Sequence, residues 1–419
     1  MTDQDESHDA RAGVAFTDIY VDDDIVDRVS DTLRSTRYVK GERVERFEAA
    51  FADRCGTDHA VGVNSGTAAL LLSMQSAGIG PGDEVFVPGH TFFASVSPVL
   101  HLGATPVFVD VDPRTCTMDP DDLAAKAERA ENPTAVVPVH LYGQLADLDA
   151  ILDVADDHDL TVVEDACQAH FATRDGHTAG ASGDAGAFSF YPSKNMTVGG
   201  DGGMLVTDDA DLATRARRLR DHGRDEEGVH REVGLNYRMS EVSAAVGREQ
   251  LDRVQEWNDA RAAAAARYDG LLAAVDGVET PTVADGAQHV YHLYVVQVPA
   301  ADRDPLRDYL AARDIETGVH YETPAHQHPA VAERVGDVSL PRTEALCDRI
   351  VSLPMHPRIA PEDVETVCAA VASYFEGKQG GVAESEPDDP ADSGTTESDP
   401  EEPTDTSPAR TDGGREESQ

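Results

Sequence analysis

The sequence predicts an α/β protein with two domains: a large domain built on a mainly parallel seven-stranded sheet, and a smaller C-terminal α+β domain. The first reason is length, because 419 residues exceed what a single hydrophobic core usually supports. The second is that short apolar runs alternate with amphipathic stretches, as in a sheet covered by helices on both faces. The third is that longer helical patterns replace this alternation after about residue 250.

Seven short apolar runs are the candidate strands of the sheet. They cover residues 59–64, 83–89, 105–112, 134–141, 161–166, 185–190 and 202–207. Amphipathic stretches, which predict helices, separate most of them and lie at residues 68–77, 120–131 and 147–157. Ligands bind at the carboxyl ends of the strands in such sheets, so the residues that follow each strand are the first candidates for a site.

The remaining segments define the predicted domain boundaries. A long helical region at residues 240–275 is followed by a strand at 289–298 and by helices at 305–313 and 361–375. We therefore assign residues 13–250 to the large domain and residues 251–376 to the small one. The two ends, residues 1–12 and 377–419, are polar and poor in large apolar side chains, so burial cannot offset the entropy of ordering them. We expect both ends to be disordered.

The charge balance is strongly acidic. There are 79 acidic and 34 basic residues, for a formal net charge of −45, and only four of the basic residues are lysines. The negative electrostatic field of such a protein disfavours binding to nucleic acid and to anionic lipid. Repulsion among its negative charges also weakens the folded state unless salt screens them. We interpret the charge as an adaptation to the cytoplasm of a salt-loving organism; an ordinary acidic protein is the alternative.

The cysteines and the absence of targeting signals also favour the cytoplasm. The five cysteines are scattered without a CxxC pair, so reduced thiols are expected. No targeting segment and no run of 18 apolar residues is visible, which predicts a protein without a membrane anchor.

The segment Asn64-Ser65-Gly66-Thr67 joins a predicted strand to a predicted helix. Free backbone N–H groups and the positive end of the helix dipole would meet at Gly66 and Thr67 and form a cup for phosphate. The alternative is that Ser65 and Thr67 only cap the helix.

Further candidates follow strands at the same sheet edge. Phe92 and Phe93 come after the strand at 83–89, where one aromatic face can cover a flat ring while the other packs in the core. Asp165 ends the strand at 161–166, where a buried carboxylate needs a cation, either in a structural salt bridge or on a protonated pyridine nitrogen. Gln168 is either a surface side chain or a hydrogen-bond donor to a ring oxygen.

Lys194 lies in a loop between two apolar strands, just before a glycine run. A lysine attacks an aldehyde only as a neutral amine, and partial desolvation favours that form. Because the chain has nearly eliminated lysine, its retention here favours a nucleophile over a solvent-facing side chain. The glycine run precedes a strand rather than opening a helix, so it is not a dinucleotide-binding motif.

Seven segments, in this order, closely resemble the DegT/DnrJ/EryC1/StrS family of sugar aminotransferases, which depend on pyridoxal 5′-phosphate (PLP). They are NSGTAAL, PGHTFFAS, VVEDACQAH, FSFYPSKN, GGDGGMLVT, LNYRMSEVSAAVG and GVHYETPAH. The resemblance extends from about residue 15 to residue 376. It implies fold type I of the PLP-dependent transferases and a homodimer whose active sites lie at the subunit interface.

The resemblance also implies roles for the residues that match these motifs. Lys194 is the residue that forms the Schiff base with PLP, and Asp165 pairs with the pyridine nitrogen. The other implied cofactor contacts are Gly66, Thr67 and Ser189 at the phosphate, Phe92 on the ring, Gln168 near the ring oxygen, and Asn236 from the partner subunit. Tyr321 and His326 match a loop near the sugar, although His326-Gln327-His328 departs from the family pattern.

The histidines of that loop do not predict a metal site. His320, His326 and His328 are close in sequence, but no set of carboxylates or cysteines accompanies them. We therefore expect no metal.

The implied reaction moves an amino group from glutamate to a nucleotide-linked keto-sugar and yields an amino-sugar for glycan or polysaccharide synthesis. A PLP-dependent sugar dehydratase on the same fold is one alternative, but that branch carries histidine in place of the Schiff-base lysine, and Lys194 argues against it. A cyclitol aminotransferase is a second alternative. A non-catalytic regulator with this fold is a third, although a regulator would have no need of all the cofactor groups.

Overall fold

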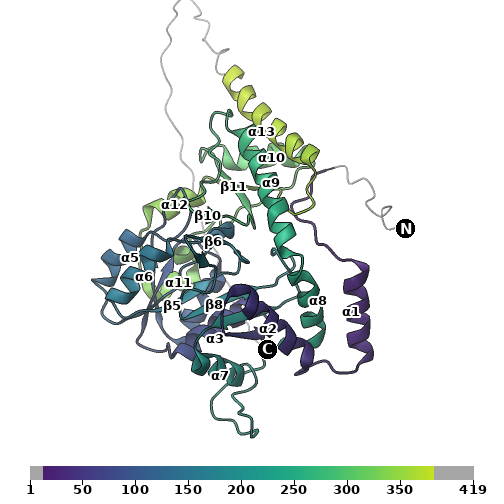
Figure 1. The fold of residues 1–419 in the computed structure, drawn as a ribbon. Coiled ribbons are helices and arrows are strands. Elements are labelled where there is room, and N and C mark those ends of the chain that lie inside the picture. Colours follow the sequence, from purple (N-terminus) through teal and green to yellow (C-terminus); the bar gives the residue numbers. More distant parts are fainter. Residues whose placement is uncertain (1–12, 382–419) are drawn as a thin grey trace, which may run out of the picture. The chain divides into compact units, whose positions relative to one another are not determined.

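The computed structural model describes residues 13–381 of the chain (Figure 1). The predicted disordered N-terminus, residues 1–12, and residues 382–419 of the predicted tail lie outside the described residues. The described residues up to Gly377 form one compact unit.

A seven-stranded sheet lies at the centre of this unit, as the sequence predicts. Its strands are β1 (His59–Val63), β2 (Glu84–Pro88), β3 (Thr105–Val109), β4 (Pro133–Val136), β5 (Thr161–Asp165), β8 (Ala185–Ser189) and β9 (Gly203–Thr207). Their order across the sheet is β1-β9-β8-β5-β4-β2-β3. Strand β9 runs antiparallel to β1 and β8, and the other neighbouring strands are parallel. The mainly parallel sheet and its seven strands are therefore confirmed.

Alternate strand residues pack on opposite faces of the sheet. One face, which includes Val61, Val85 and Leu205, packs against α3 (Gly66–Ala77), α4 (Ser97–Leu102) and α7 (Ala210–Leu219). The other face, which includes Phe86 and Met204, packs against α2 (Glu42–Cys55), α5 (Pro120–Ala127) and α6 (Leu148–Asp157). Because helices cover both faces, the edge at the carboxyl ends of the parallel strands is where a ligand can enter.

A further core belongs to the C-terminal part of the chain. It is formed by α9 (Val254–Leu272), β11 (Tyr294–Gln297), α10 (Arg303–Ala311), β12 (Ile350–Leu353) and α13 (Pro361–Gly381). Strands β11 and β12 pair antiparallel. Helix α1 (Asp23–Arg34) lies beside α8 (Glu241–Leu251). Two short helices, α11 (Pro329–Val335) and α12 (Pro341–Cys347), follow the 3-10 turn η3 (Ala325–Gln327) in the chain. The predicted domain boundary, after residue 250, falls one residue before the end of α8 and stays a prediction.

The structure corrects two elements predicted after residue 240. The helical region at 240–275 is interrupted at Asp252 and Arg253, which divides it into α8 and α9. Of the strand predicted at 289–298, only β11 forms, because the backbone N–H groups of Val290 and Leu293 instead donate hydrogen bonds to the carbonyls of Gly143 and Tyr142. A small three-stranded sheet also forms, which the sequence pattern did not predict. Its strands are β6 (Thr173–Arg174), β7 (His177–Thr178) and β10 (Ala287–Gln288). None of the helices within residues 13–381 is both long and apolar enough to cross a membrane.

Candidate active site

A cavity of about 400 Å³ opens where β5 and β8 end and α3 begins. Eight of the ten predicted site residues line it. They are Gly66, Thr67, Phe92, Asp165, Gln168, Ser189, Lys194 and Tyr321. Because these residues come from distant parts of the sequence, the fold itself assembles the site at the sheet edge where the sequence predicts it.

The N-terminus of α3 forms one wall of the cavity. Ser65 is the N-cap residue, and its hydroxyl oxygen accepts a hydrogen bond from a backbone N–H of the first turn. A Cβ atom at Gly66 would lie 2.7 Å from Cβ of Ser189 and 2.9 Å from Sγ of Cys167, so only glycine lets the helix approach β8 this closely. The N–H groups that open a helix have no partner within it and carry the positive end of its dipole. This wall therefore suits a phosphate group.

Asp165 is the last residue of β5, and its carboxylate is buried. Its Oδ2 accepts a hydrogen bond of 2.7 Å from the Ser95 hydroxyl, and its Oδ1 accepts one of 3.1 Å from the backbone N–H of Cys167. Among the described residues, no lysine, arginine or histidine forms an ion pair with it. A buried carboxylate calls for a cationic partner, and a protonated pyridine nitrogen in the cavity would provide one.

The amide of Gln168 has a fixed orientation. Its Oε1 accepts a hydrogen bond of 2.8 Å from the backbone N–H of Tyr142, and its Nε2 donates one of 2.9 Å to the Tyr321 hydroxyl. The second hydrogen on Nε2 stays available to an oxygen in the cavity. Burial raises the pKa of Tyr321, so its hydroxyl stays protonated at neutral pH.

The two neighbouring phenylalanines take different positions. Phe92 is 55% exposed and lines the cavity, with its ring centroid 5.6 Å from that of Tyr321. Phe93 is partly buried and packs against the core beneath α3. Of the two, Phe92 can therefore cover a flat ring.

Lys194 enters the cavity from the loop after β8. Its backbone N–H donates a hydrogen bond of 2.8 Å to the carbonyl of Tyr191, which closes a tight turn. Burial lowers the pKa of the Lys194 ammonium, and the nearby Cys167 and Asp165 only partly oppose this effect. A larger share of the side chain is thus a neutral, nucleophilic amine than in a solvent-exposed lysine.

Two predicted site residues lie outside this cavity. Asn236 is exposed on the segment that pairs with Asp221, and its carbonyl accepts a 3.5 Å hydrogen bond from the Asn64 side chain. His326 is only 2% exposed, and its Nε2 lies 3.2 Å from a carboxylate oxygen of Glu344. The structure does not bring His326 to the cavity, because η3 turns the chain into the protein after Pro324 and buries this imidazole beside Phe108.

The site also contains residues that were not assigned there from the sequence, and four of them bear on its chemistry. His292, His320 and Tyr191 line the cavity, and Ser95 supports Asp165. One signal was present: His292 interrupts an otherwise apolar run. Ser95 and Tyr191 stood inside motifs that were recognised, but nothing in their spacing indicates which way their side chains point.

These groups fit PLP, the cofactor that the resemblance implies. The helix N-terminus suits its phosphate, the unpaired buried carboxylate suits its protonated ring nitrogen, and the partly neutral lysine suits its aldehyde. Within residues 13–381, no group of three or more His, Cys, Asp or Glu side chains is arranged to hold a metal ion.

Comparison with known sequences agrees with this geometry. Residues 20–372 match the DegT/DnrJ/EryC1/StrS aminotransferase family. The chain is 44% identical over 349 residues to dTDP-3-amino-3,4,6-trideoxy-alpha-D-glucose transaminase of Streptomyces venezuelae, which covers 83% of this chain and 91% of that protein. It is 42% identical over 339 residues to GDP-perosamine synthase of Caulobacter vibrioides, which covers 79% of this chain and 90% of that one.

Solved structures agree as well. The structure of S. venezuelae DesV in complex with a ketimine intermediate superposes with a TM-score of 0.84 at 42% identity and covers 87% of this chain and 99% of that one. The structure of NtdA from Bacillus subtilis with bound cofactor PMP gives a TM-score of 0.78 at 29% identity, over 84% of this chain and 81% of that one. The chain therefore belongs to the DegT/DnrJ/EryC1/StrS aminotransferase family and is a PLP-dependent aminotransferase.

Proposed function

We propose that this enzyme transfers an amino group from glutamate to a nucleotide-linked keto-sugar, with Lys194 and Asp165 as its catalytic residues. The observation that carries the proposal is that the Lys194 amine, the Asp165 carboxylate and the N-terminus of α3 all line one cavity. An amine for the aldehyde, a carboxylate for the ring nitrogen and a cup for the phosphate are the three groups that PLP needs from a protein.

The cofactor contacts follow from the positions of the cavity residues. Gly66, Thr67 and Ser189 surround the helix N-terminus and would hold the phosphate. Phe92 would cover one face of the ring, and the free Nε2 hydrogen of Gln168 would reach the ring oxygen.

In the proposed mechanism, the residues of this chain supply the proton transfers. When bound, PLP would supply an aldehyde that condenses with amines and a ring that accepts the electrons released when a C–H bond of the amino donor breaks. The Nζ atom of Lys194, with its lowered pKa, takes the proton from the donor carbon and later delivers one to the acceptor carbon. Asp165 keeps the ring nitrogen protonated. Phe92 and Tyr321 narrow the cavity and limit the access of water.

The relatives support the choice of substrate. One is named for a dTDP-linked amino-sugar and another for a GDP-linked one, so a nucleotide-linked sugar is common to both names. For contact with the sugar we propose Tyr321 rather than His326, because Tyr321 lines the cavity and His326 does not.

We also propose a homodimer in which Asn236 completes the partner's site. Large apolar side chains are exposed just before Asn236 in the chain and at the cavity. They include Val229, Val233, Leu235, Phe92 and Tyr191, and Val233 is 88% exposed.

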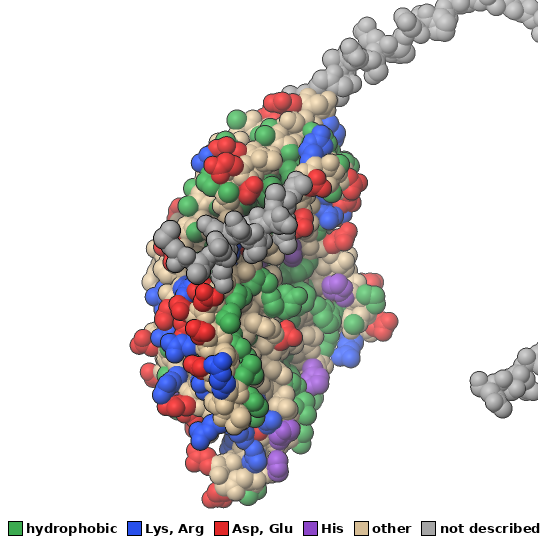
Figure 2. Space-filling model, turned by 90° about the vertical axis from the view of Figure 1, so that its right-hand side faces the viewer, with side chains coloured by type: hydrophobic (Ala, Val, Ile, Leu, Met, Phe, Trp, Pro, Cys, Tyr) green, Lys and Arg blue, Asp and Glu red, His purple; other side chains and the backbone are tan. Residues whose placement is uncertain are grey.

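A second group of exposed apolar side chains lies on and around α1. Its members are Ile19, Val21, Val26, Leu33, Tyr38 and Val39. Figure 2 views the side on which α1 lies in Figure 1 and shows hydrophobic side chains gathered between charged ones. Apolar side chains that gather on one side of a protein in this way are typical of an interface.

The proposed location is a salt-rich cytoplasm. All five cysteines have free thiols, as expected in a reducing compartment. The net charge of −45 is the support for high salt, since counter-ions must screen the repulsion within such a chain.

The direct test is to incubate the purified protein with PLP, glutamate and a panel of nucleotide-linked keto-sugars, and to follow the release of 2-oxoglutarate. We expect 2-oxoglutarate and an amino-sugar in equal amounts, and neither with Lys194→Ala. A deoxygenated sugar without nitrogen would instead indicate a dehydratase. Bound cofactor without turnover on any sugar or cyclitol ketone would indicate a regulator.

A further inference from the structure

The cavity contains a buried imidazole to which the proposed function gives no role. We propose that His292 is a positioning residue for Lys194: its ring holds the lysine amino group through a hydrogen bond at Nε2 and keeps that amino group in reach of the cofactor aldehyde. This inference rests on the proposed role of Lys194.

The contact joins two segments that are far apart in the sequence. His292 is buried and lines the cavity. Its Nε2 lies 3.5 Å from Nζ of Lys194, a hydrogen bond that is longer than usual. Among the described residues, this imidazole is the hydrogen-bond partner of the Lys194 amino group, and no carboxylate forms an ion pair with it. The amine is therefore held by a neutral group. A carboxylate in the same place would hold it as well, but would favour the unreactive ammonium form.

The surroundings of His292 keep its ring uncharged. Burial lowers the pKa of His292 well below its ordinary range, and the positive charges of Lys194 and Arg261 add to this effect, with smaller contributions from His320 and His170. A neutral imidazole has one donor and one acceptor nitrogen, so it can pair with Nζ either as an amine or as an ammonium. The Nδ1 atom of His292 is buried without a hydrogen-bond partner, which leaves Nε2 as the polar contact of the ring.

A buried guanidinium fixes the backbone that carries this ring. Nη1 of Arg261, on α9, lies 3.2, 3.4 and 3.1 Å from the carbonyl oxygens of Tyr291, His292 and Met355, to which it donates hydrogen bonds. Residues 289–293 are not part of a regular strand, so these bonds replace the pairing that would otherwise hold them. The position of the imidazole is thereby set independently of Lys194.

The test compares two side chains of similar length at position 292. Gln can reach Nζ with a polar carboxamide, whereas Met cannot form the hydrogen bond. Apoprotein is mixed with PLP between pH 6 and 9, the rate of Schiff-base formation is followed by absorbance, and borohydride then fixes the adduct for mass spectrometry. We expect His292→Met to form the adduct at Lys194 about tenfold more slowly, the effect of one lost hydrogen bond of about 1.4 kcal/mol, and His292→Gln to stay within about threefold of the natural protein.

His289→Met is the matched control. His289 is also buried and lies on the same segment, where its ring stacks on Tyr291, but it does not line the cavity. This variant should form the adduct at the natural rate. Should His292→Met fail to fold, as judged by circular dichroism, His292→Asn replaces it, because its shorter side chain does not reach Nζ.

The possible results separate the two proposals. Two results would overturn the positioning role. A natural rate of adduct formation in His292→Met would show that the hydrogen bond has no effect on the rate. Equal slowing in His292→Met and His292→Gln would show that the shape of the imidazole matters and its hydrogen bond does not. An adduct on Lys40, Lys126 or Lys378 would instead overturn the proposed function of Lys194 itself.

Discussion

The hydroxyl of Ser95 donates a hydrogen bond of 2.7 Å to the carboxylate of Asp165, although the two residues lie 70 positions apart. Ser95 ends the 3-10 turn η1 (Phe93–Ser95), and Thr91 lies 2.7 Å from the same hydroxyl. All three side chains are buried. The loop after β2 therefore orients the carboxylate at the end of β5, and the active site depends on how these two parallel strands are placed.

Ser95→Ala should lower kcat about tenfold while the affinity for PLP changes little. The variant removes one hydrogen bond to a charged group, which contributes about 1.5 kcal/mol, and leaves Asp165 free to rotate away from the ring nitrogen. Steady-state kinetics and a cofactor titration measure the two quantities. Thr91→Val, which removes only the outer hydroxyl, should have a smaller effect on kcat. An unchanged kcat in Ser95→Ala would show that the backbone N–H of Cys167 is enough to orient Asp165.

Much of this site could be predicted from the sequence, because it depends on local pattern. Asp165 and Lys194 follow apolar strands, and parallel strands bring their carboxyl ends to one edge, so the order of elements alone places both residues together. Ser95 and His292 could not be predicted in the same way. Their roles depend on contacts between segments about 70 and 100 positions apart, and on hydrogen bonds that divert residues 289–293 from the strand their apolar pattern indicates.

His326 shows the opposite case. Its motif suggests a place near the sugar, but two residues earlier Pro324 begins a turn that buries the ring against Glu344 and Phe108. A motif fixes the identity of a residue and its place along the chain. Whether the side chain faces the cavity depends on a turn that the pattern did not indicate.

Lys194→Ala should abolish the visible absorbance of the purified enzyme, because no other amine of this chain lines the cavity within residues 13–381. In the natural protein, borohydride should fix the cofactor to Lys194, as peptide mapping by mass spectrometry can show. Lys126→Ala is the control. Lys126 donates hydrogen bonds to Asp122 and to the carbonyl of Phe108, so its loss should leave the absorbance unchanged. A reduced adduct on Lys126 would contradict the assignment.

Asp165→Asn should retain PLP but lose at least about a hundredfold in turnover, roughly 2.7 kcal/mol of barrier. The carboxamide keeps the shape of the side chain and can still pair with Ser95. It carries no charge, so it no longer keeps the ring nitrogen protonated. Spectroscopic titration should show cofactor binding close to that of the natural protein. Near-normal turnover would remove Asp165 from the mechanism.

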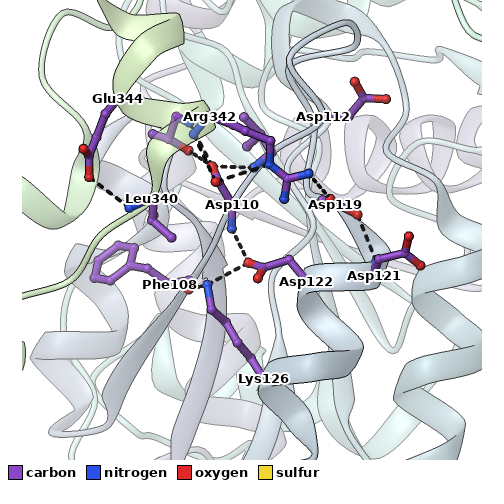
Figure 3. A network of polar contacts seen from close by, with 12 residues as sticks. Phe108, Asp110, Asp112, Asp119, Asp121, Asp122, Lys126, Leu340, Arg342 and Glu344 are labelled. Carbon is purple, nitrogen blue, oxygen red and sulfur yellow. Dashed lines mark hydrogen bonds and ion pairs between the residues drawn. The ribbon is translucent and has the colours of Figure 1, made fainter.

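A polar network that joins β3 to α12 should stabilise the fold in a pH-dependent way. Figure 3 shows Asp110 at its centre, with Arg342 between Asp110 and Asp119. One oxygen of Asp110 accepts two hydrogen bonds of 2.8 Å, from the backbone N–H and the hydroxyl of Thr343. Burial alone would raise the pKa of Asp110, but the bonds from Thr343, Val111 and Arg342 outweigh it and lower the pKa.

Asp110→Asn should therefore lower the free energy of unfolding at pH 7 by about 2 kcal/mol. A carboxyl group with a lowered pKa in the folded state stabilises the protein above its unfolded pKa, roughly 3.9, and the effect is lost as pH falls through the folded pKa. The difference between the two proteins should shrink below about pH 4. Chemical denaturation at several pH values measures it. Asp304→Asn, which removes the exposed carboxylate of an ion pair with Arg303, should change little at any pH. A difference for Asp110→Asn that stays constant down to pH 2 would contradict the role of its charge.

The last prediction concerns salt and follows from the distribution of charge. Residues 377–419 contain 13 acidic and 3 basic residues, a net −10 of the total −45, so about −35 belongs to the rest of the chain. At low ionic strength the Debye length reaches tens of ångströms, so repulsion acts across each subunit and across the proposed dimer. At molar salt the Debye length falls to about 3 Å.

Activity and dimer formation should therefore both require high salt, and both should decline together as the salt concentration is lowered. Sedimentation and rate measurements from about 0.1 to 3 M KCl test this. We expect deletion of residues 382–419 to shift the salt requirement only slightly. The sequence predicts a disordered tail there, and charges on a disordered chain can move apart while those on a folded surface cannot. A fully active dimer at 0.1 M KCl would refute the salt adaptation and leave the aminotransferase assignment unchanged.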